Sequence, residues 1–284
     1  MPANLLFSMG EYFSLKHIPF LGRSRIPFEH EEFFRNSSLL STSFYSRQLA
    51  VVYGVSGSGK TSLISYATNT LDPSAFRICH IELCEPQKRS VYRTIATKMG
   101  LRPAFYADDI KEQIIRFFRS ENEQGKFCAL IIDEAHSLSI PLLEELRSFY
   151  EEGGNFSLVL CGLPALVTNT LSLAINAPFR QRINLFIEIS NLTLSGTQDY
   201  IRAILKNCGS RNEIFDEKCY SLIHSNTSGV PRRINQLCYQ ALLHAFLDKR
   251  SVITSDDFNR LLLKMPHVFQ TGKDTGTNAI PFES

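Results

Sequence analysis

The stretch that most constrains the fold of this chain is Gly54-Val55-Ser56-Gly57-Ser58-Gly59-Lys60-Thr61. It matches the phosphate-binding pattern G-x-x-x-x-G-K-[ST] at every fixed position. Residues 48–53 before it form a short apolar run that predicts a strand, and residues 61–70 after it predict a helix. A strand, a glycine turn and a helix N-terminus direct backbone N–H groups and a positive dipole end at one point, which suits a polyphosphate. The alternative is a chance glycine turn between a strand and a helix.

Residues within this stretch have different expected roles. The glycines let the backbone approach phosphates without a clash from Cβ. Lys60 is expected to reach the β and γ phosphates as a catalytic group, and the Thr61 hydroxyl to ligate Mg²⁺. The expected nucleotide-binding residues here are Gly54, Ser56, Gly57, Ser58, Gly59, Lys60, Thr61 and Ser62.

A second candidate site follows the apolar run of residues 127–132, which predicts a buried parallel strand ending in Asp133 and Glu134. In an open α/β sheet, ligands bind at the carboxyl ends of the strands. We expect Asp133, on a strand neighbouring the phosphate loop, to hold Mg²⁺ through water and Glu134 to activate the attacking water. This pair favours hydrolysis over phosphoryl transfer to a metabolite. A polar strand end that caps the next helix is the alternative.

The order of elements predicts the architecture. Further strands are expected at residues 76–84, 156–161 and 184–189, each separated by helical patterns, which indicates a doubly wound parallel sheet of five core strands. From about residue 195 the apolar residues keep helical spacing. We therefore predict an α/β nucleotide-binding domain over residues 31–194 and an all-helical lid over residues 195–266.

The two ends of the chain carry weaker patterns. Residues 1–30 are aromatic and contain prolines, so we predict an extended N-terminal strap that closes over an adenine base or packs on the sheet. Residues 267–284 are rich in Gly, Thr, Asn and Pro and predict a mobile, disordered tail.

Composition excludes several classes of protein. No apolar run approaches the roughly 18 residues of a membrane span, and the first ten residues have no signal-peptide pattern, so a cytoplasmic protein without a membrane partner is expected. Seven scattered cysteines without a C-x-x-C pair argue against zinc and fit a reducing compartment. A net charge of +2 means that any contact with nucleic acid comes from a local patch.

Such a patch lies between Lys88 and Lys126, where nine Lys/Arg and five Asp/Glu leave a charge of +4. A patch repeated by each subunit of an assembly would add up along a phosphate backbone, without base readout. The candidates for contact with DNA are Lys88, Arg89, Arg93 and Lys98, and the alternative is an ordinary solvated helix face.

Three arginines are candidates for contact with the nucleotide, two of them through its γ-phosphate. Arg182, and after it Arg180, precede the last strand and could project from one subunit into the site of its neighbour. The alternative is two solvated arginines at a helix end. Arg232 follows Pro231, which suits the first position of a helix, and is expected to face the nucleotide from the lid.

These motifs together resemble AAA+ ATPases, and more narrowly their ExeA-like branch. The resemblance is carried by Glu11-Tyr12-Phe13-Ser14-Leu15-Lys16-His17-Ile18-Pro19-Phe20, by Leu130-Ile131-Ile132-Asp133-Glu134-Ala135-His136 and by Gly229-Val230-Pro231-Arg232-Arg233-Ile234-Asn235. It covers roughly residues 10–264. The branch includes secretion-accessory ATPases and transposition regulators of the TnsC and TniB kind. Because the chain stops soon after the lid, we expect a transposition regulator.

The resemblance implies a slow, assembly-dependent ATPase that uses ATP and Mg²⁺. Such a protein forms rings or helical homo-oligomers on duplex DNA and recruits a transposase, with a targeting adaptor as a further partner. An ATPase that assists assembly of secretion machinery without DNA is the alternative, and a small-molecule kinase is a third. One departure concerns Cys161-Gly162-Leu163-Pro164, where the family often has Gly-Gln-Pro, so that a polar sensor of the γ-phosphate is not evident.

Overall fold

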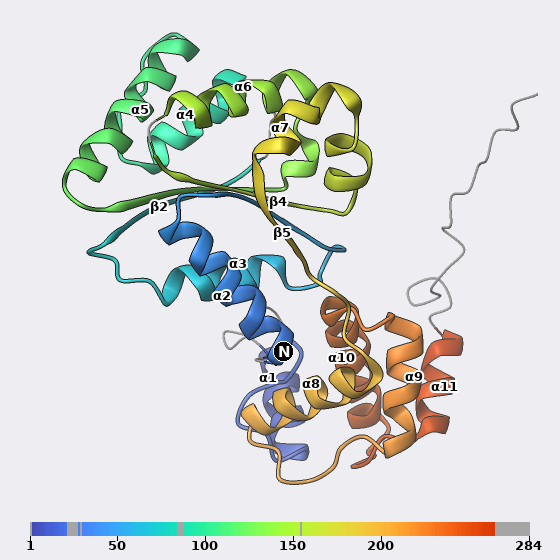
Figure 1. Cartoon of the computed structure of the whole chain (residues 1–284). Coiled ribbons are helices and arrows are strands. Elements are labelled where there is room, and N and C mark those ends of the chain that lie inside the picture. The colour runs from blue at the N-terminus through green and yellow to red at the C-terminus, as the bar shows by residue number, and fades with distance from the viewer. Residues whose placement is uncertain (1, 22–27, 29, 84–87, 154, 265–284) are drawn as a thin grey trace, which may run out of the picture. The chain divides into compact units, whose positions relative to one another are not determined.

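The computed structural model describes residues 2–21, 28, 30–83, 88–153 and 155–264 (Figure 1). The chain divides into two compact units. One is Pro27–Ser190, and the other combines Met1–Ile26 with Asn191–Ser284. The tail expected at residues 267–284 lies outside the described residues.

The unit Pro27–Ser190 is built on a five-stranded parallel sheet in the order β2-β3-β4-β1-β5. The strands are β1 (Leu49–Tyr53), β2 (Phe76–Glu82), β3 (Phe127–Asp133), β4 (Ser157–Gly162) and β5 (Ile183–Glu188). This confirms the doubly wound parallel sheet predicted from the alternation of elements.

Helices cover both faces of this sheet (Figure 1). One face packs against α2 (Glu31–Tyr45) and α3 (Lys60–Asn69), and the other against α4 (Lys88–Lys98), α5 (Ala107–Glu123), α6 (Ile140–Glu152) and α7 (Ala177–Arg182). Because successive strand residues point to opposite faces, Leu49 and Val51 of β1 enter one core and Ala50 and Val52 the other. All four side chains are fully buried, which explains why this strand reads as a continuous apolar run.

The strand order corrects one expectation about the acidic strand. We expected β3 to neighbour the strand that leads into the phosphate loop, but β4 lies between β3 and β1 and pairs with both. The register sets Ile132 of β3 against Leu160 of β4, and Val52 of β1 against Cys161. The carboxyl ends of all three strands therefore still meet at the same edge of the sheet.

Short helical turns complete this unit at the carboxyl ends of β3 and β4. They are η1 (Ala135–Ser137), the π-helical turn η2 (Leu166–Leu171) and η3 (Ala174–Asn176). Leu166 and Leu171 are buried in the same core as Leu158 and Leu160 of β4, so the turns are fixed by packing on the sheet.

The other unit is helical. It contains α8 (Leu194–Asn207), α9 (Glu217–Thr227), α10 (Pro231–Leu247) and α11 (Ser255–Lys264), as predicted from the change of pattern near residue 195. Its core includes the buried stripe on α10 formed by Ile234, Leu237, Cys238, Ala241, Leu242 and Ala245. Among the described residues, no helix has the length and apolar character needed to cross a membrane.

The prediction of an extended N-terminal strap is wrong for its first part, because α1 (Pro2–Tyr12) is a helix. Pro2 stands at the helix start, where its missing N–H costs nothing, and Pro19 comes after the helix has ended. The segment belongs to the helical unit: the ring of Tyr12 lies 5.6 Å from that of Phe246, and Lys16 N–H donates to the carbonyl of Cys208 at 2.8 Å.

Candidate functional site

The glycine-rich stretch forms the connection between β1 and α3, and its backbone explains the glycines. Gly57 and Gly59 have φ angles of 81° and 106°, in the left-handed region that side chains disfavour. A Cβ atom on Gly54 would lie 2.7 Å from the carbonyl oxygen of Ile189 and 2.8 Å from Ser58 Oγ. The loop can thus close over β5 only with glycine at position 54.

Gly59 is the N-cap of α3, and no side chain caps this helix end. The first-turn N–H groups and the positive end of the helix dipole therefore remain available to an anion. Ser58 Oγ is buried and has no hydrogen-bond partner among the described residues. A bound phosphate oxygen could accept a hydrogen bond from this hydroxyl. Ser56 and Ser62 are exposed on either side of it.

Lys60 lies across the loop that it belongs to. Its side chain is buried, and Nζ donates to the carbonyl oxygens of Gly54 at 2.9 Å and Val55 at 3.0 Å. These neutral acceptors keep the ammonium group inside the loop, where phosphate oxygens would be stronger partners because they carry charge.

The acidic strand end meets the start of α3 directly. The Thr61 hydroxyl donates to Asp133 Oδ2 at 3.2 Å, across 72 residues of sequence. Asp133 is buried, and its Oδ1 accepts the N–H of Glu134 at 2.9 Å. The two residues predicted to hold Mg²⁺ are thus brought together, and the carboxylate is fixed by donors on both of its oxygens.

Glu134 has a different environment from Asp133. Its side chain is 45% exposed, so the carboxylate reaches solvent, as a group that activates water must. Its backbone is left-handed, with φ 57°, and its carbonyl accepts the N–H and the hydroxyl of Ser137 at 3.1 and 2.8 Å. The strand therefore turns sharply at this residue into η1.

Three further side chains near the acids received no role in the sequence analysis. His80 Nε2, on β2, lies 3.9 Å from Asp133 Oδ2, and burial lowers its pKa against the attraction of that carboxylate. Burial, and then the charge of Asp133, raise the pKa of the Cys161 thiol at the end of β4. His136 Nδ1 lies 3.3 Å from Glu134 Oε2. All three lie on or just after strands of the same sheet, and this was the sequence signal that could have placed them near the acids.

Together these residues fit a nucleoside triphosphate with Mg²⁺. No group of three or more His, Cys, Asp or Glu among the described residues forms a metal cage. Mg²⁺ does not need one, since it is commonly held by one carboxylate, substrate phosphates and water. Thr61 and Asp133 would hold the cation, and the orphaned Ser58 hydroxyl, Lys60 and the helix end would hold the phosphates.

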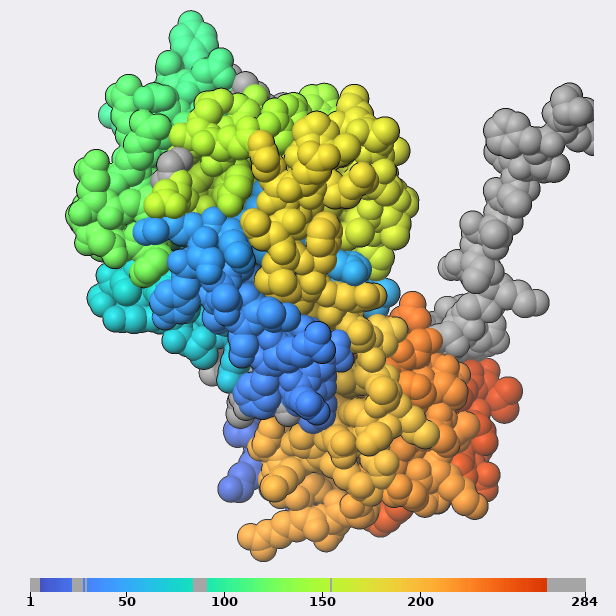
Figure 2. All heavy atoms as spheres, in the orientation of Figure 1, coloured from blue at the N-terminus to red at the C-terminus, as the bar shows by residue number. Residues whose placement is uncertain are grey.

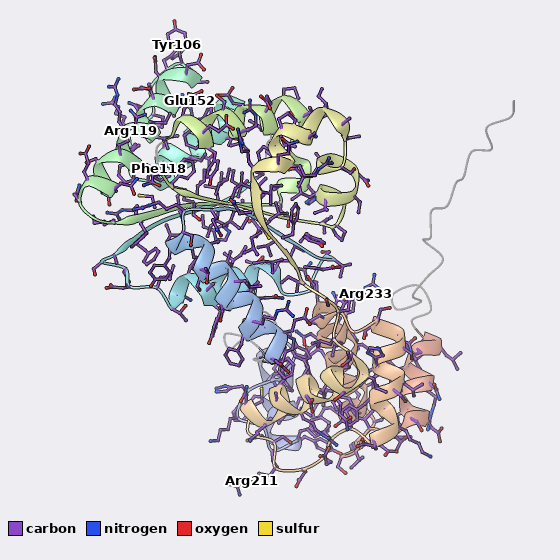
Figure 3. The ribbon with its side chains drawn as sticks, in the orientation of Figure 1. Tyr106, Phe118, Arg119, Glu152, Arg211 and Arg233 are labelled. Carbon is purple, nitrogen blue, oxygen red and sulfur yellow. The ribbon has the colours of Figure 1, made fainter. Side chains whose placement is uncertain are left out.

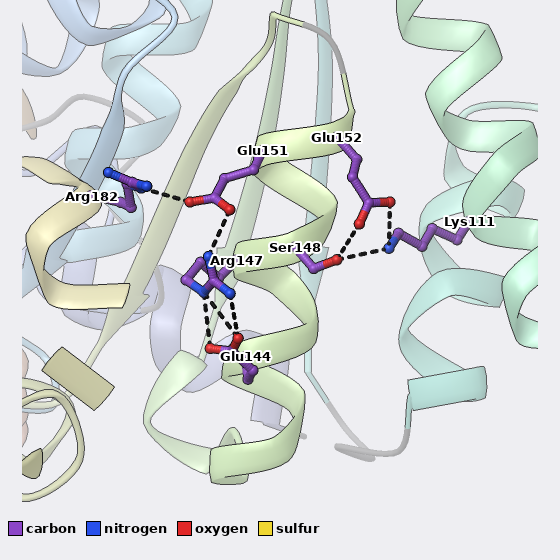
Figure 4. Close-up of polar contacts among 7 residues, drawn as sticks. All are labelled: Lys111, Glu144, Arg147, Ser148, Glu151, Glu152 and Arg182. Carbon is purple, nitrogen blue, oxygen red and sulfur yellow. Dashed lines mark hydrogen bonds and ion pairs between the residues drawn. The ribbon is translucent and has the colours of Figure 1, made fainter. Parts of the chain in front are cut away.

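The candidate arginine fingers lie on α7, which with β5 is at the surface of its unit (yellow in Figure 2). Arg182 is exposed, and its Nε donates to Glu151 Oε1 at 2.6 Å. Glu151 also accepts from Arg147, which pairs with Glu144, so that Arg182 ends a chain of ion pairs along α6 (Figure 4). Arg180 donates to the carbonyls of Leu171 and Ser172, both at 3.1 Å. A role for either arginine in a neighbouring subunit stays a prediction.

Arg232 lies in the first turn of α10, directly after Pro231, and is exposed. It belongs to the helical unit, so its contact with a nucleotide also stays a prediction.

The candidate DNA-contact residues lie on α4. Lys88 and Arg89 begin this helix, and their side chains fall outside the described part of the chain. Arg93 and Lys98 are exposed, and Arg93 donates to the carbonyl of Ala104 at 3.4 Å.

The loop after α4 adds a feature that the sequence analysis missed. Phe105 and Tyr106 are each 68% exposed, with ring centroids 5.1 Å apart, and Tyr106 points outward just before α5 (Figure 3). A basic helix beside exposed aromatic rings fits a nucleic-acid surface, and contact with DNA stays a prediction.

The chain resembles known proteins in both sequence and fold. Residues 43–171, which run from the end of α2 through the phosphate loop and both acids to the end of η2, match the family model described as "AAA domain". The match supports an AAA+ ATPase and covers less than half of the chain. The General secretion pathway protein A of Aeromonas hydrophila is 31% identical over 126 residues. That match spans 43% of this chain and 23% of the relative.

Solved structures with a fold similar to that of this chain include the Aeropyrum pernix ORC2 protein in ADPNP-ADP complexes. It has a TM-score of 0.67 at 15% identity, over 86% of this chain and 70% of that chain. Drosophila ORC bound to DNA has a TM-score of 0.62 at 17% identity, over 92% of this chain and 66% of that chain. At such identities the likeness concerns the fold, which is the AAA+ P-loop fold with a helical C-terminal region.

Proposed function

We propose that this protein binds Mg²⁺ and ATP at the 54–61 loop and hydrolyses the nucleotide to ADP and phosphate. The observation that carries the proposal is the hydrogen bond of 3.2 Å between Thr61 and Asp133, which joins the phosphate loop to the acidic strand end. Lys60 and the N-terminus of α3 would neutralise the phosphates. The bound cation would spread the charge that develops on the transferred phosphate.

Glu134 would act as the general base in this reaction. It is more exposed than Asp133, and two hydrogen bonds from Ser137 to its carbonyl fix its backbone at the turn into η1. An accessible carboxylate beside a magnesium ligand can take a proton from a water molecule as that water attacks the γ-phosphate. This division of roles supports hydrolysis over transfer to a metabolite.

Hydrolysis would be slow in the single subunit and faster in a ring or helical assembly. Arg182, and after it Arg180, lie on the exposed α7 and would reach the γ-phosphate of a neighbouring copy. Arg182 must then leave Glu151, its present partner at 2.6 Å. Both side chains of this pair are partly exposed, so solvent screens their attraction and release is easy.

We further propose that the assembly forms on duplex DNA and regulates transposition by recruiting a transposase. The DNA part is supported by the exposed Arg93 and Lys98 on α4, and by the fold it shares with a structure of ORC bound to DNA. The transposition part rests on the resemblance of three sequence motifs to the ExeA-like branch, which includes regulators of the TnsC and TniB kind. Contacts would go to the phosphate backbone and not to base edges.

A second candidate function is assistance to secretion machinery without DNA. It is favoured by the 31% identity to the General secretion pathway protein A over 126 residues. The match covers 23% of that protein, so it concerns the ATPase domain that both share.

Retention on DNA separates the two functions. Immobilised duplex DNA is incubated with the protein, with Mg²⁺ and a slowly hydrolysed ATP analogue, at low and at high salt. We expect retention that needs nucleotide and that falls as salt rises. In the double variant Arg93→Ala/Lys98→Ala, the salt slope should drop by about one for each phosphate that the protein no longer neutralises. The variant Lys206→Ala/Lys249→Ala removes the same charge from exposed positions of the helical unit and is the control.

Lack of retention at low salt with nucleotide bound would reject the DNA function and leave the secretion role. Phosphate release without any acceptor molecule, measured in parallel, would exclude a small-molecule kinase.

A further inference from the structure

His136 is the side chain that the structure places against the proposed general base. It lies in η1, the single turn of 3₁₀-helix that follows Glu134. Its Nδ1 is 3.3 Å from Glu134 Oε2, which is within the distance of an ion pair. The ring is about three-quarters buried, with 26% of the side chain exposed, whereas the Glu134 side chain is 45% exposed.

The backbone around this contact is fixed from several sides. Glu134 adopts a left-handed conformation, which costs free energy in a residue other than glycine. Two hydrogen bonds from Ser137 to its carbonyl offset that cost. The backbone of His136 itself lies against the end of β4, where a Cβ atom on Gly162 would stand 3.0 Å from the His136 backbone nitrogen. The His136 backbone is therefore held in place next to Glu134, and its ring contacts the Glu134 carboxylate from a fixed position.

The residues at the end of β4 provide no polar side chain that could contact the Glu134 carboxylate in place of His136. The Cys161 side chain is directed at Asp133, Gly162 has no side chain, and Leu163 is apolar. No polar side chain among these three residues thus faces Glu134. The imidazole supplies the polar group that the strand end lacks.

The geometry of the contact shows how it can work. The separation is that of an ion pair, and Nδ1 is buried without a hydrogen-bond partner among the described residues. A small rotation of the Glu134 carboxylate would turn this contact into a hydrogen bond from Nδ1–H. Such a bond would hold one carboxylate oxygen and leave the other to accept a proton from water.

We propose that His136 is a positioning residue for hydrolysis, which holds the Glu134 carboxylate in the orientation that activates water. The inference rests on the proposed function, since it needs Glu134 to be the general base. His136 touches neither nucleotide nor water in this scheme and acts through Glu134.

The test uses single-turnover hydrolysis of ATP by the full chain and by three variants. In His136→Ala we expect the rate at saturating ATP to fall about 10- to 100-fold, because misplacement of a reacting group by about 1 Å has an effect of that size. The Kd for Mg²⁺ and ATP should stay within about twofold, because this variant keeps every group that binds phosphate or cation. His136→Gln, whose amide can donate to the carboxylate, should recover part of the rate. Ser139→Ala is the control, since Ser139 is exposed and its side chain does not cap α6.

A double-mutant cycle shows whether the two residues act together. In the Glu134→Gln background, His136→Ala should cause no further loss of rate, because the group that it positions is gone. Equal losses in both backgrounds would overturn the inference, as would an unchanged rate in His136→Ala or a glutamine variant no better than alanine. If the wild-type chain itself releases no phosphate, the proposed function fails first and the inference falls with it. Thermal unfolding of each variant excludes a general loss of folding.

Discussion

Lys60 offers the sharpest test of the phosphate site, through its replacement by methionine. The Lys60 side chain is 8% exposed, and Nζ donates to the carbonyls of Gly54 and Val55 at 2.9 and 3.0 Å. Methionine has a similar length and an adaptable apolar stem, so Lys60→Met removes the charge with little change in packing.

The size of the effect follows from the partners of the ammonium group. When ATP binds, Nζ would exchange two neutral carbonyl oxygens for anionic phosphate oxygens. Hydrogen bonds to charged groups contribute about 1.5–3 kcal/mol, so their loss should raise the Kd for ATP about 10- to 150-fold. At an ATP concentration of about 100 times the wild-type Kd, ligand binding adds about 2.7 kcal/mol to the free energy of unfolding. With a Kd raised about 100-fold, the same ATP adds about 0.4 kcal/mol.

Thermal unfolding with increasing ATP and Mg²⁺ measures this difference, and titration with a fluorescent ATP analogue gives the Kd directly. Lys16→Met is the control, because Lys16 is an exposed lysine of the helical unit. Without nucleotide, Lys60→Met should unfold close to the wild-type temperature. Stabilisation by ATP equal to that of wild type, or a Kd within about twofold of it, would refute the assignment of Lys60 to the phosphates.

Three further variants probe the base, the finger and the loop. Glu134→Gln should bind ATP normally, lose about 10²- to 10⁴-fold in hydrolysis and stay longer on DNA, and wild-type turnover would reject its role as base. Arg182→Ala should lower phosphate release at protein concentrations where the chain is assembled, and an equal loss in dilute monomer would show that it does not act across subunits. Gly54→Ala should abolish ATP binding and destabilise the protein by about 1–3 kcal/mol in denaturant unfolding, because its Cβ meets the Ile189 carbonyl at 2.7 Å. Normal ATP affinity in that variant would contradict the close packing of the loop.

The sequence predicted the parts of the fold that depend on neighbours in the chain. The strand before Gly54, the helix after it and the buried strand before Asp133 all follow from local pattern, because apolar runs and glycine positions record burial and backbone geometry. The contact between Thr61 and Asp133 was implied by their separate roles, although no local pattern joins them.

What the sequence did not predict depends on pairing over long distances. The insertion of β4 between β3 and β1 leaves no trace in either strand, since all three are apolar on both faces. The helix α1 was hidden by prolines that lie at its start or beyond its end. The ion pair of Arg182 with Glu151 joins residues 31 positions apart, and the packing of His136 on Gly162 depends on η1 turning back to β4.

The dependence of ATP affinity on Mg²⁺ tests the central claim most directly, because it measures the coupling of the phosphate loop to Asp133. ATP binding is measured by calorimetry with Mg²⁺ and with a chelator, for wild type, Asp133→Asn and Thr61→Ala. We predict that Mg²⁺ strengthens ATP binding to wild type about 5- to 150-fold, the usual range of coupling between two ligands. Both variants should lose most of this gain and still bind ATP through the loop and Lys60. An equal gain in wild type and Asp133→Asn, or no ATP binding by wild type at all, would contradict the account.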